Sequence, residues 1–154
     1  MNKKLPDSFG KERIYNKNFK DIKQPIILWD VLKIKSEQNI IVRFLKTNSN
    51  NLQGIRLAID VGNGEIIINN IKSKIFELWA DTCPYEVEIQ CYSEEGFLSV
   101  YNIYEKKGEW GGRRSQTAYC GMILEKNNNV YRYYCNDVYS DNITFDKLVF
   151  ELEL

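Results

Sequence analysis

Apolar and polar residues alternate in short runs through most of the chain after residue 24, and this period of two is the feature that most restricts the fold. Successive side chains of a β-strand point to opposite faces, so an alternating run marks a strand with one face on a core and the other in water. No stretch of helix length repeats its apolar residues with a period of about 3.6. The clearest alternating runs are Ile55–Val61, Tyr85–Cys91 and Lys147–Leu154.

About ten such runs follow one another, and each is predicted to be a strand. Because so many short strands must bury their apolar faces against another layer, we expect an all-β, single-domain, mainly antiparallel β-sandwich or jelly-roll-like fold, or a related barrel-like closure. The N-terminal arm is expected to be irregular or partly helical, and a short helix is otherwise expected only over residues 138–145. The predicted strands are Ile26–Ile34, Asn39–Lys46, Ile55–Val61, Glu65–Ile71, Lys74–Ala80, Tyr85–Tyr92, Phe97–Tyr104, Ala118–Glu125, Val130–Cys135 and Lys147–Leu154.

Three turn signals lie between these runs, at Val61–Glu65, Ser93–Gly96 and Lys126–Asn129. Gly and Asn adopt a left-handed backbone at low cost, so each signal predicts a hairpin. The apolar sides of the clean strands are then expected to line one core. That predicted core consists of Ile55, Leu57, Ile59, Val61, Val87, Ile89, Leu148, Phe150 and Leu152.

One pairing follows from the third turn signal. If residues 127 and 128 centre that turn, Cys120 faces Cys135 across the hairpin, with the Cβ atoms about 5 Å apart. The two side chains are then either thiols packed side by side or a redox-sensitive cross-strand disulfide, which such a geometry would strain.

Charge divides the chain into two parts. Residues 1–24 hold seven Lys and Arg against three Asp and Glu, and residues 25–154 hold 14 against 18. We therefore expect a basic N-terminal arm, either mobile and solubilising or in contact with phosphates or an acidic partner, followed by the β domain. The net charge is zero and no apolar run approaches the ~20 residues that span a bilayer, so neither nucleic acid nor a membrane is an expected partner.

Histidine is absent, and this excludes several kinds of chemistry. Ser–His and Cys–His nucleophile pairs need a base that titrates near neutral pH, and histidine is also the commonest transition-metal ligand. The four cysteines lack the close paired spacing of a zinc site, so we expect no metal and no cofactor. The N-terminus lacks the apolar core of a secretory signal, which predicts a cytoplasmic protein with reduced thiols.

Two segments are candidate binding sites. The glycine-rich loop Lys106–Thr117 carries Trp110, Arg113 and Arg114, and Trp and Arg are enriched at the energetic centres of protein interfaces. The second segment is aromatic and acidic; it contains Tyr131 and Tyr133 and runs on to Asp137, Asp141 and Asp146. The spacing of these aspartates does not match a calcium-binding EF-hand loop, so a turn stabilised by Asx side chains is the expected structure.

Two pairs of glutamates have the spacing of a carboxylate-based active site. Glu86 and Glu88 share a strand face, as do Glu151 and Glu153, and side chains two apart on a strand lie about 7 Å from each other. That separation overlaps the one an inverting glycosidase uses. These are also the polar positions of cleanly alternating strands, which is typical of a solvated sheet face.

Three functions are consistent with these residues, and the first is preferred. The chain is expected to be a non-enzymatic cytoplasmic binding protein that recognises another protein, of an inhibitor or toxin-neutralising type by analogy with other small β domains. The alternatives are a carbohydrate-binding module that uses a row of exposed aromatic rings, and a carboxylate-based hydrolase with one acid of raised pKa.

Overall fold

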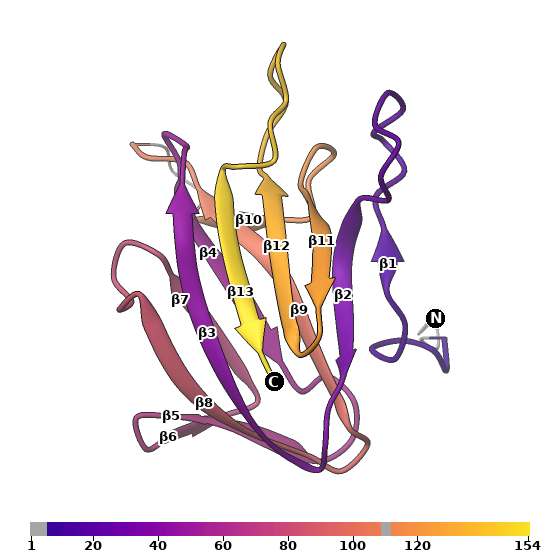
Figure 1. The fold of residues 1–154 in the computed structure, drawn as a ribbon, viewed down its shortest axis with the longest axis vertical. Coiled ribbons are helices and arrows are strands. Elements are labelled where there is room, and N and C mark those ends of the chain that lie inside the picture. The colour runs from indigo at the N-terminus through magenta and orange to yellow at the C-terminus, as the bar shows by residue number, and fades with distance from the viewer. Residues whose placement is uncertain (1–5, 109–111) are drawn as a thin grey trace.

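The computed structural model describes residues 6–108 and 112–154 (Figure 1). Over these residues the chain forms 13 strands, the pairings are antiparallel, and no helix is present. The all-β prediction is therefore confirmed, and the two segments in which a short helix was expected contain none in their described parts. The strands are β1 (Ile14–Tyr15), β2 (Ile27–Lys33), β3 (Glu37–Thr47), β4 (Leu52–Ala58), β5 (Gly64–Ile68), β6 (Ile71–Ser73), β7 (Ile75–Trp79), β8 (Glu86–Ser93), β9 (Phe97–Glu105), β10 (Arg113–Ser115), β11 (Gly121–Asn127), β12 (Val130–Asn136) and β13 (Leu148–Glu153).

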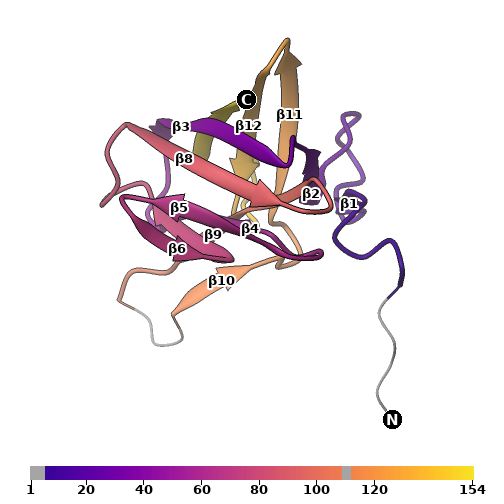
Figure 2. The same ribbon diagram turned by 90° about the horizontal axis from the view of Figure 1, so that it is seen from below.

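The strands form one continuous sheet that nearly closes on itself. Its order is β6-β5-β8-β3-β13-β12-β11-β2-β9-β4-β7, with β1 added to β2 and β10 added to β9. The end strands β6 and β7 are separated in the chain only by Lys74, so the two ends of the sheet meet at that residue. Seen from below, β3 and β8 lie on one side of the molecule and β4 and β9 on the other (Figure 2). The fold is thus barrel-like, and β2 joins the two halves that a sandwich would keep as separate sheets.

Two of the three predicted hairpins are wrong. β4 pairs with β7 and β9, whereas β5 pairs with β6 and β8, so the turn at Val61–Glu65 carries the chain from one side of the barrel to the other. The turn at Ser93–Gly96 makes a second such crossing, from β8 to β9. Gly62 and Gly96 do have positive φ, of 70° and 78°. A turn residue therefore marks where the chain bends, but it does not identify the strand that becomes the partner.

The third hairpin is present, with a register two residues from the predicted one. Asn127 pairs with Val130, so Asn128, with a φ of 56°, and Asn129 form the turn. Cys135 therefore faces Met122 and not Cys120, and the predicted pairing of the two cysteines is wrong. All four cysteines are free thiols, and burial raises the pKa of the Cys120 thiol to about 11.

The predicted core residues line the inside of the barrel, in seven cases with almost no exposure. Tyr133 joins this set, and its ring stacks on Phe150 with centroids 4.9 Å apart. Val61 and Val87 are only half-buried, because they lie at a turn and near a strand end. The seven buried residues are Ile55, Leu57, Ile59, Ile89, Leu148, Phe150 and Leu152.

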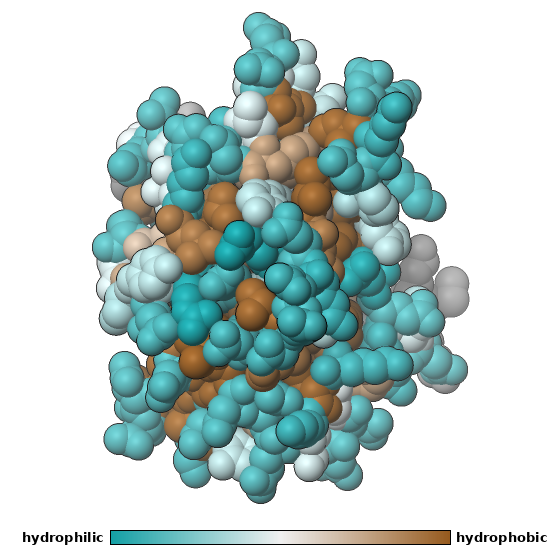
Figure 3. Space-filling view, in the orientation of Figure 1, coloured by the Kyte–Doolittle hydropathy of each residue, from teal (hydrophilic) through white to brown (hydrophobic). Residues whose placement is uncertain are grey.

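A row of alternating charges crosses the outer face of the sheet. Arg43 on β3 lies between Glu86 on β8 and Glu151 on β13, with nitrogen–oxygen distances of 2.8 and 3.3 Å. Arg132 on β12 continues the row and bonds the other oxygen of Glu151 at 3.1 Å. In Figure 3 polar side chains cover much of this face, with apolar patches between them. Opposite charges on neighbouring strands stabilise their pairing, so the row supports the sheet across four strands.

The N-terminal arm is bound to the barrel along its described length. β1 pairs with β2, and the Phe9 ring meets the edge of Trp29 with centroids 5.5 Å apart. The side-chain amide of Asn16 donates hydrogen bonds to the carbonyl oxygens of Ala118 and Cys120, at 3.0 and 2.8 Å. The two Asn16 hydrogen bonds join the arm to the segment that precedes β11.

A buried carboxylate connects the arm to the core. Asp30 on β2 has no solvent exposure, and it accepts hydrogen bonds from the Arg13 guanidinium, the Tyr133 hydroxyl and the Val31 amide, at 2.7, 2.7 and 2.9 Å. Burial raises the pKa of the Tyr133 phenol well above its ordinary value of 10.0, so this hydroxyl keeps its proton and remains a donor. Three separate elements therefore meet at one carboxylate.

We expect Arg13→Ala to lower the free energy of unfolding by about 2 kcal/mol, because it removes the charged donor to a buried carboxylate. Urea unfolding monitored by tryptophan fluorescence measures the change. Lys11→Ala is the matched control: this side chain lies exposed on the same arm, and its loss should change the free energy by about 0.5 kcal/mol or less. Equal effects of the two substitutions would contradict the role given to Asp30.

Candidate functional site

Four connecting segments meet at one end of the barrel, the upper end in Figure 1, and together they form the surface called here the loop end. Side-chain hydrogen bonds join the arm to the segment before β11, and the β3–β4 connection to the β12–β13 connection. Ring contacts join the arm to both the segment before β11 and the β12–β13 connection. The segments are residues 16–26, 48–51, 116–120 and 137–147.

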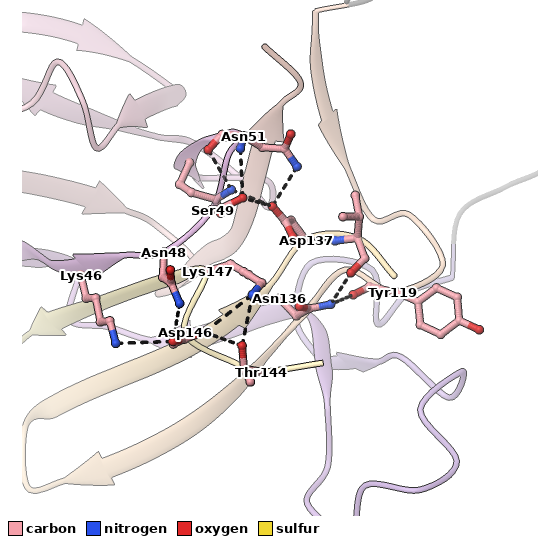
Figure 4. A network of polar contacts seen from close by, with 12 residues as sticks. Lys46, Asn48, Ser49, Asn51, Tyr119, Asn136, Asp137, Thr144, Asp146 and Lys147 are labelled. Carbon is pink, nitrogen blue, oxygen red and sulfur yellow. Dashed lines mark hydrogen bonds and ion pairs between the residues drawn. The ribbon is translucent and has the colours of Figure 1, made fainter. Parts of the chain in front are cut away.

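Asp137 fixes two of these segments to each other (Figure 4). Its side chain is 1% exposed, and one carboxylate oxygen accepts hydrogen bonds from Ser49, Asn51 and Gln53, at 2.7, 3.0 and 2.9 Å. The other oxygen accepts the amide hydrogen of Val138 at 2.7 Å. A buried carboxylate must be hydrogen-bonded to offset its desolvation, so the β3–β4 connection has little freedom to leave the β12–β13 connection.

Asp146 holds the same two segments at their outer side (Figure 4). Its carboxylate accepts hydrogen bonds from Thr144, Asn48 and Lys46, at 2.6, 2.8 and 3.4 Å. These bonds, the one from Thr144 first, lower the pKa of Asp146 from 3.8 to about 2. Lys147 donates a hydrogen bond to Thr144 at 3.1 Å, which completes a closed network.

The predicted Asx turn is not what these aspartates form: Asp137 and Asp146 mainly accept hydrogen bonds from residues 46–53. Asp137 and Asp146 belong to separate networks, and hydrogen-bond donors already occupy the carboxylate oxygens. Within the part of the chain that the structure describes, no three Asp, Glu, Cys or His side chains are grouped as metal ligands.

An aromatic cleft lies beside the Asp137 network. Tyr119 directs its carbonyl oxygen toward Asn136 and its ring away from the network (Figure 4). That ring contacts Phe19 of the arm and Tyr139 of the β12–β13 connection, with centroids 5.7 and 5.0 Å apart. Tyr139 is 60% exposed, one of the largest exposures of an aromatic side chain in the described chain. The rings border an open cleft of about 490 Å³.

Four polar side chains of this cleft are uncommitted, whereas the Asn18 amide is bonded to the Ala118 carbonyl oxygen. Asp21 and Asp141 both line it, and neither makes a hydrogen bond or ion pair with any other described residue. Lys20 on the same rim has no such partner either. The Ser140 hydroxyl is buried and has no hydrogen-bond partner among the described residues. These groups contrast with Asp137 and Asp146 a few residues away, whose oxygens are fully used.

A second pocket lies on the other side of the β12–β13 connection, and its charge is the opposite. It is an open depression of about 760 Å³ lined by Lys106, Lys107 and Lys147 together with the amides of Asn48, Asn50 and Asn51. The same connection thus separates an acidic, aromatic cleft from a basic, amide-rich pocket.

The predicted site residues do not form one cluster. Trp110 lies outside the described residues. Arg113 begins β10 and bonds Glu77 on β7 at 2.6 Å, and Arg114 is half-buried beside it. Tyr131 lies at the far end of β12 from the loop end, half-buried under Lys126.

Tyr133 lies inside the barrel, where its hydroxyl bonds Asp30. The signal for its position was present in the sequence, because Tyr131, Tyr133 and Cys135 are alternate residues on the face of β12 that faces the core. The residues of the cleft were not predicted as a group, since Phe19, Tyr119 and Tyr139 come from three distant segments.

The glutamate pairs lie on the outer face of the sheet, where Glu88 and Glu153 also line an open pocket of about 530 Å³. Glu86 and Glu88 are exposed, and Glu86 is paired with Arg43. Glu151 bonds two arginines, and Glu153 is near one of them at 3.5 Å. Three of these four carboxylates are thus ion-paired with arginines of the sheet.

No protein-family model matches the chain, and neither does any curated protein. Among the described residues there is no helix of the length and apolar character that crosses a membrane.

The pH dependence of the stability of the Asp146→Asn variant tests the hydrogen-bond network around Asp146. Because folding lowers the pKa of this carboxylate from 3.8 to about 2, its contribution to stability is present above pH 4 and is lost as the pH falls toward 2. We expect the variant to be less stable by about 1 kcal/mol at neutral pH, since partial exposure screens the interaction, and to match the unchanged protein near pH 2. Urea unfolding across this pH range measures the difference. Asp141→Asn, which removes no bond, should show none at any pH.

Proposed function

We propose that this protein is a non-enzymatic cytoplasmic binding protein that holds another protein at its loop end. The observation that carries the proposal is the aromatic cleft, with an exposed tyrosine and uncommitted polar groups placed on a hydrogen-bonded frame. Tyrosine is enriched in protein interfaces because its ring supplies a large contact area with few rotatable bonds, while its hydroxyl remains able to pair.

The frame beneath the cleft supports binding. Asp137 and Asp146 each join the β3–β4 and β12–β13 connections, so the segment that carries Tyr139 is held at both of its ends. A surface that is already ordered loses little conformational entropy when a partner binds. The loop end therefore has the pre-formed character that tight recognition needs.

The carboxylates argue for binding over hydrolysis. Asp30, Asp137 and Glu151 are buried, and each is bonded to side chains that belong to the fold. Glu86 is exposed and paired with Arg43, and Glu88 lines an open pocket of about 530 Å³ with Glu153, whose carboxylate lies 3.5 Å from the same arginine. The four free thiols support the cytoplasmic part of the proposal, because that compartment keeps thiols reduced.

Carbohydrate binding is the second candidate, and the same cleft favours it. The exposed ring of Tyr139, with carboxylate and amide side chains beside it, presents both the apolar face and the hydrogen-bonding groups that a sugar ring requires. A glycan array distinguishes the two: binding of a sugar by the unchanged protein, lost on Tyr139→Ala, would support this candidate against the first.

A photo-crosslinking amino acid at position 139 tests protein binding directly. We expect cells that express this variant to yield a discrete protein adduct after illumination. The same replacement at Tyr85 is the matched control, because Tyr85 is 62% exposed, close to the 60% of Tyr139, and lies away from the loop end. Adducts of equal yield from both positions, or from neither, would contradict the proposal.

The role of the glycine-rich loop Lys106–Thr117 is tested with the partner that the crosslink at position 139 captures. If the partner also covers Lys106–Thr117, the double substitution Trp110→Ala and Arg113→Ala should weaken its binding about tenfold or more, as loss of an interface centre does. Isothermal titration calorimetry measures the affinity. An unchanged affinity would show that this loop lies outside the interface.

A further inference from the structure

We propose that the aromatic cleft takes a cationic side chain, the ammonium of a lysine or the guanidinium of an arginine, from the partner protein. This inference rests on the proposed function and adds the chemistry of the group that is recognised. It is carried by three observations at the cleft: the arrangement of the rings, the uncommitted acids and the buried hydroxyl.

The rings present faces and edges in different directions. The Phe19 and Tyr119 planes meet at 87° and the Tyr119 and Tyr139 planes at 58°, so the three rings that line the cleft are inclined to one another and do not form a flat platform. A cation is attracted to the face of an aromatic ring within about 6 Å of its centroid, and several inclined rings are the arrangement that encloses one. A sugar ring, in contrast, stacks best on a flat exposed face.

The charges of the cleft select a cation. Asp21 and Asp141 line it without any partner in the described chain, and only Lys20 offsets them. Other acids of the loop end, Asp137 and Asp146, have their oxygens occupied by the fold. The uncommitted acids are therefore the groups available to pair with an incoming charge, and pairing at the edge of an aromatic cleft is stronger than in open water.

The Ser140 hydroxyl supplies a further acceptor. Ser140 lines the cleft, and its hydroxyl oxygen is screened from solvent without a hydrogen-bond partner among the described residues, which is costly for a buried hydroxyl. Lysine and arginine carry only donors at their ends, so a cation that reaches this oxygen would satisfy it. The open cleft of about 490 Å³ has room for one such side chain.

The basic pocket across the β12–β13 connection agrees with this choice. Lys106, Lys107 and Lys147 would repel the cation that the cleft attracts. A partner that places a basic side chain in the cleft and acidic groups over the lysines is held in one orientation.

The test uses the full chain and two small probes of nearly identical shape. N-acetylarginine methylamide carries the guanidinium, and N-acetylcitrulline methylamide replaces it with a neutral urea group. Titration monitored by the amide signals of ¹⁵N-labelled protein should show the arginine probe shifting the signals of residues 18–22, 119 and 139–143. We expect the citrulline probe to bind at least about fivefold more weakly, which is the contribution of a partly exposed charge pair with an aromatic contact.

Substitutions then assign the charge. Asp21→Asn with Asp141→Asn should weaken the arginine probe at least about fivefold and leave the citrulline probe unchanged, because only the first carries a charge. Asp81→Asn is the control: Asp81 is exposed in the β7–β8 connection, and its loss should leave both affinities as they were. The double variant removes no bond of the fold, and thermal unfolding verifies that it remains folded.

Several outcomes would overturn the inference. They are equal binding of the two probes, absence of binding by both, shifts outside the cleft, or a methyl glycoside that binds the cleft while the arginine probe does not. Crosslinking from position 139 distinguishes failure of the cationic assignment from failure of the proposed protein binding. If the partner adduct persists in the Asp21→Asn, Asp141→Asn background, protein binding stands and the cationic assignment falls.

Discussion

The joint between β11 and β2 is the constraint on which closure of the barrel depends. Only Met122 and Ile27 are paired there by backbone register, so the ladder alone holds this seam weakly. Asp30 compensates from within β2, because it accepts hydrogen bonds from Tyr133 on β12 and from Arg13 on the arm. The arm therefore belongs to the fold: it covers the seam and supplies the charge that neutralises the buried carboxylate.

The acidic residues separate into those that hold the structure and those that it leaves open. Asp30 and Asp137 are buried and differ in how they are stabilised, since one is paired with a guanidinium and the other with neutral amides and a hydroxyl. Asp146 is partly exposed but fully bonded. Asp21 and Asp141 have the same chemistry and no bonds in the described chain. The residue type therefore does not indicate the role of an acid in this protein, whereas the hydrogen-bond partners of its carboxylate do.

Ten of the strands and most of the core were predictable from the sequence, whereas the short strands β1, β6 and β10 and the path of the chain were not. Alternation reports burial on one face, so Ile55 and Leu57 were placed correctly from local pattern alone. Gly62 and Gly96 mark real turns, but the next strand crosses the barrel at each of them because its partners lie elsewhere. The hairpin at Asn128 shows the same limit at finer scale: the turn lies one residue further along the chain than predicted, and this shifts every cross-strand partner by two residues.

The candidate site was less predictable, and the reason is physical. Phe19, Tyr119 and Tyr139 come together only because the arm, the segment before β11 and the β12–β13 connection are tied at one end, and no local pattern encodes that meeting. The segment around Asp137 was predicted to bind a partner because of its acids and tyrosines. Most of these side chains instead make hydrogen bonds within the protein. The groups available to a partner are the polar side chains that have no hydrogen-bond or ion-pair partner in the folded protein. A sequence shows which polar side chains exist, but only the three-dimensional contacts show which of them are already paired.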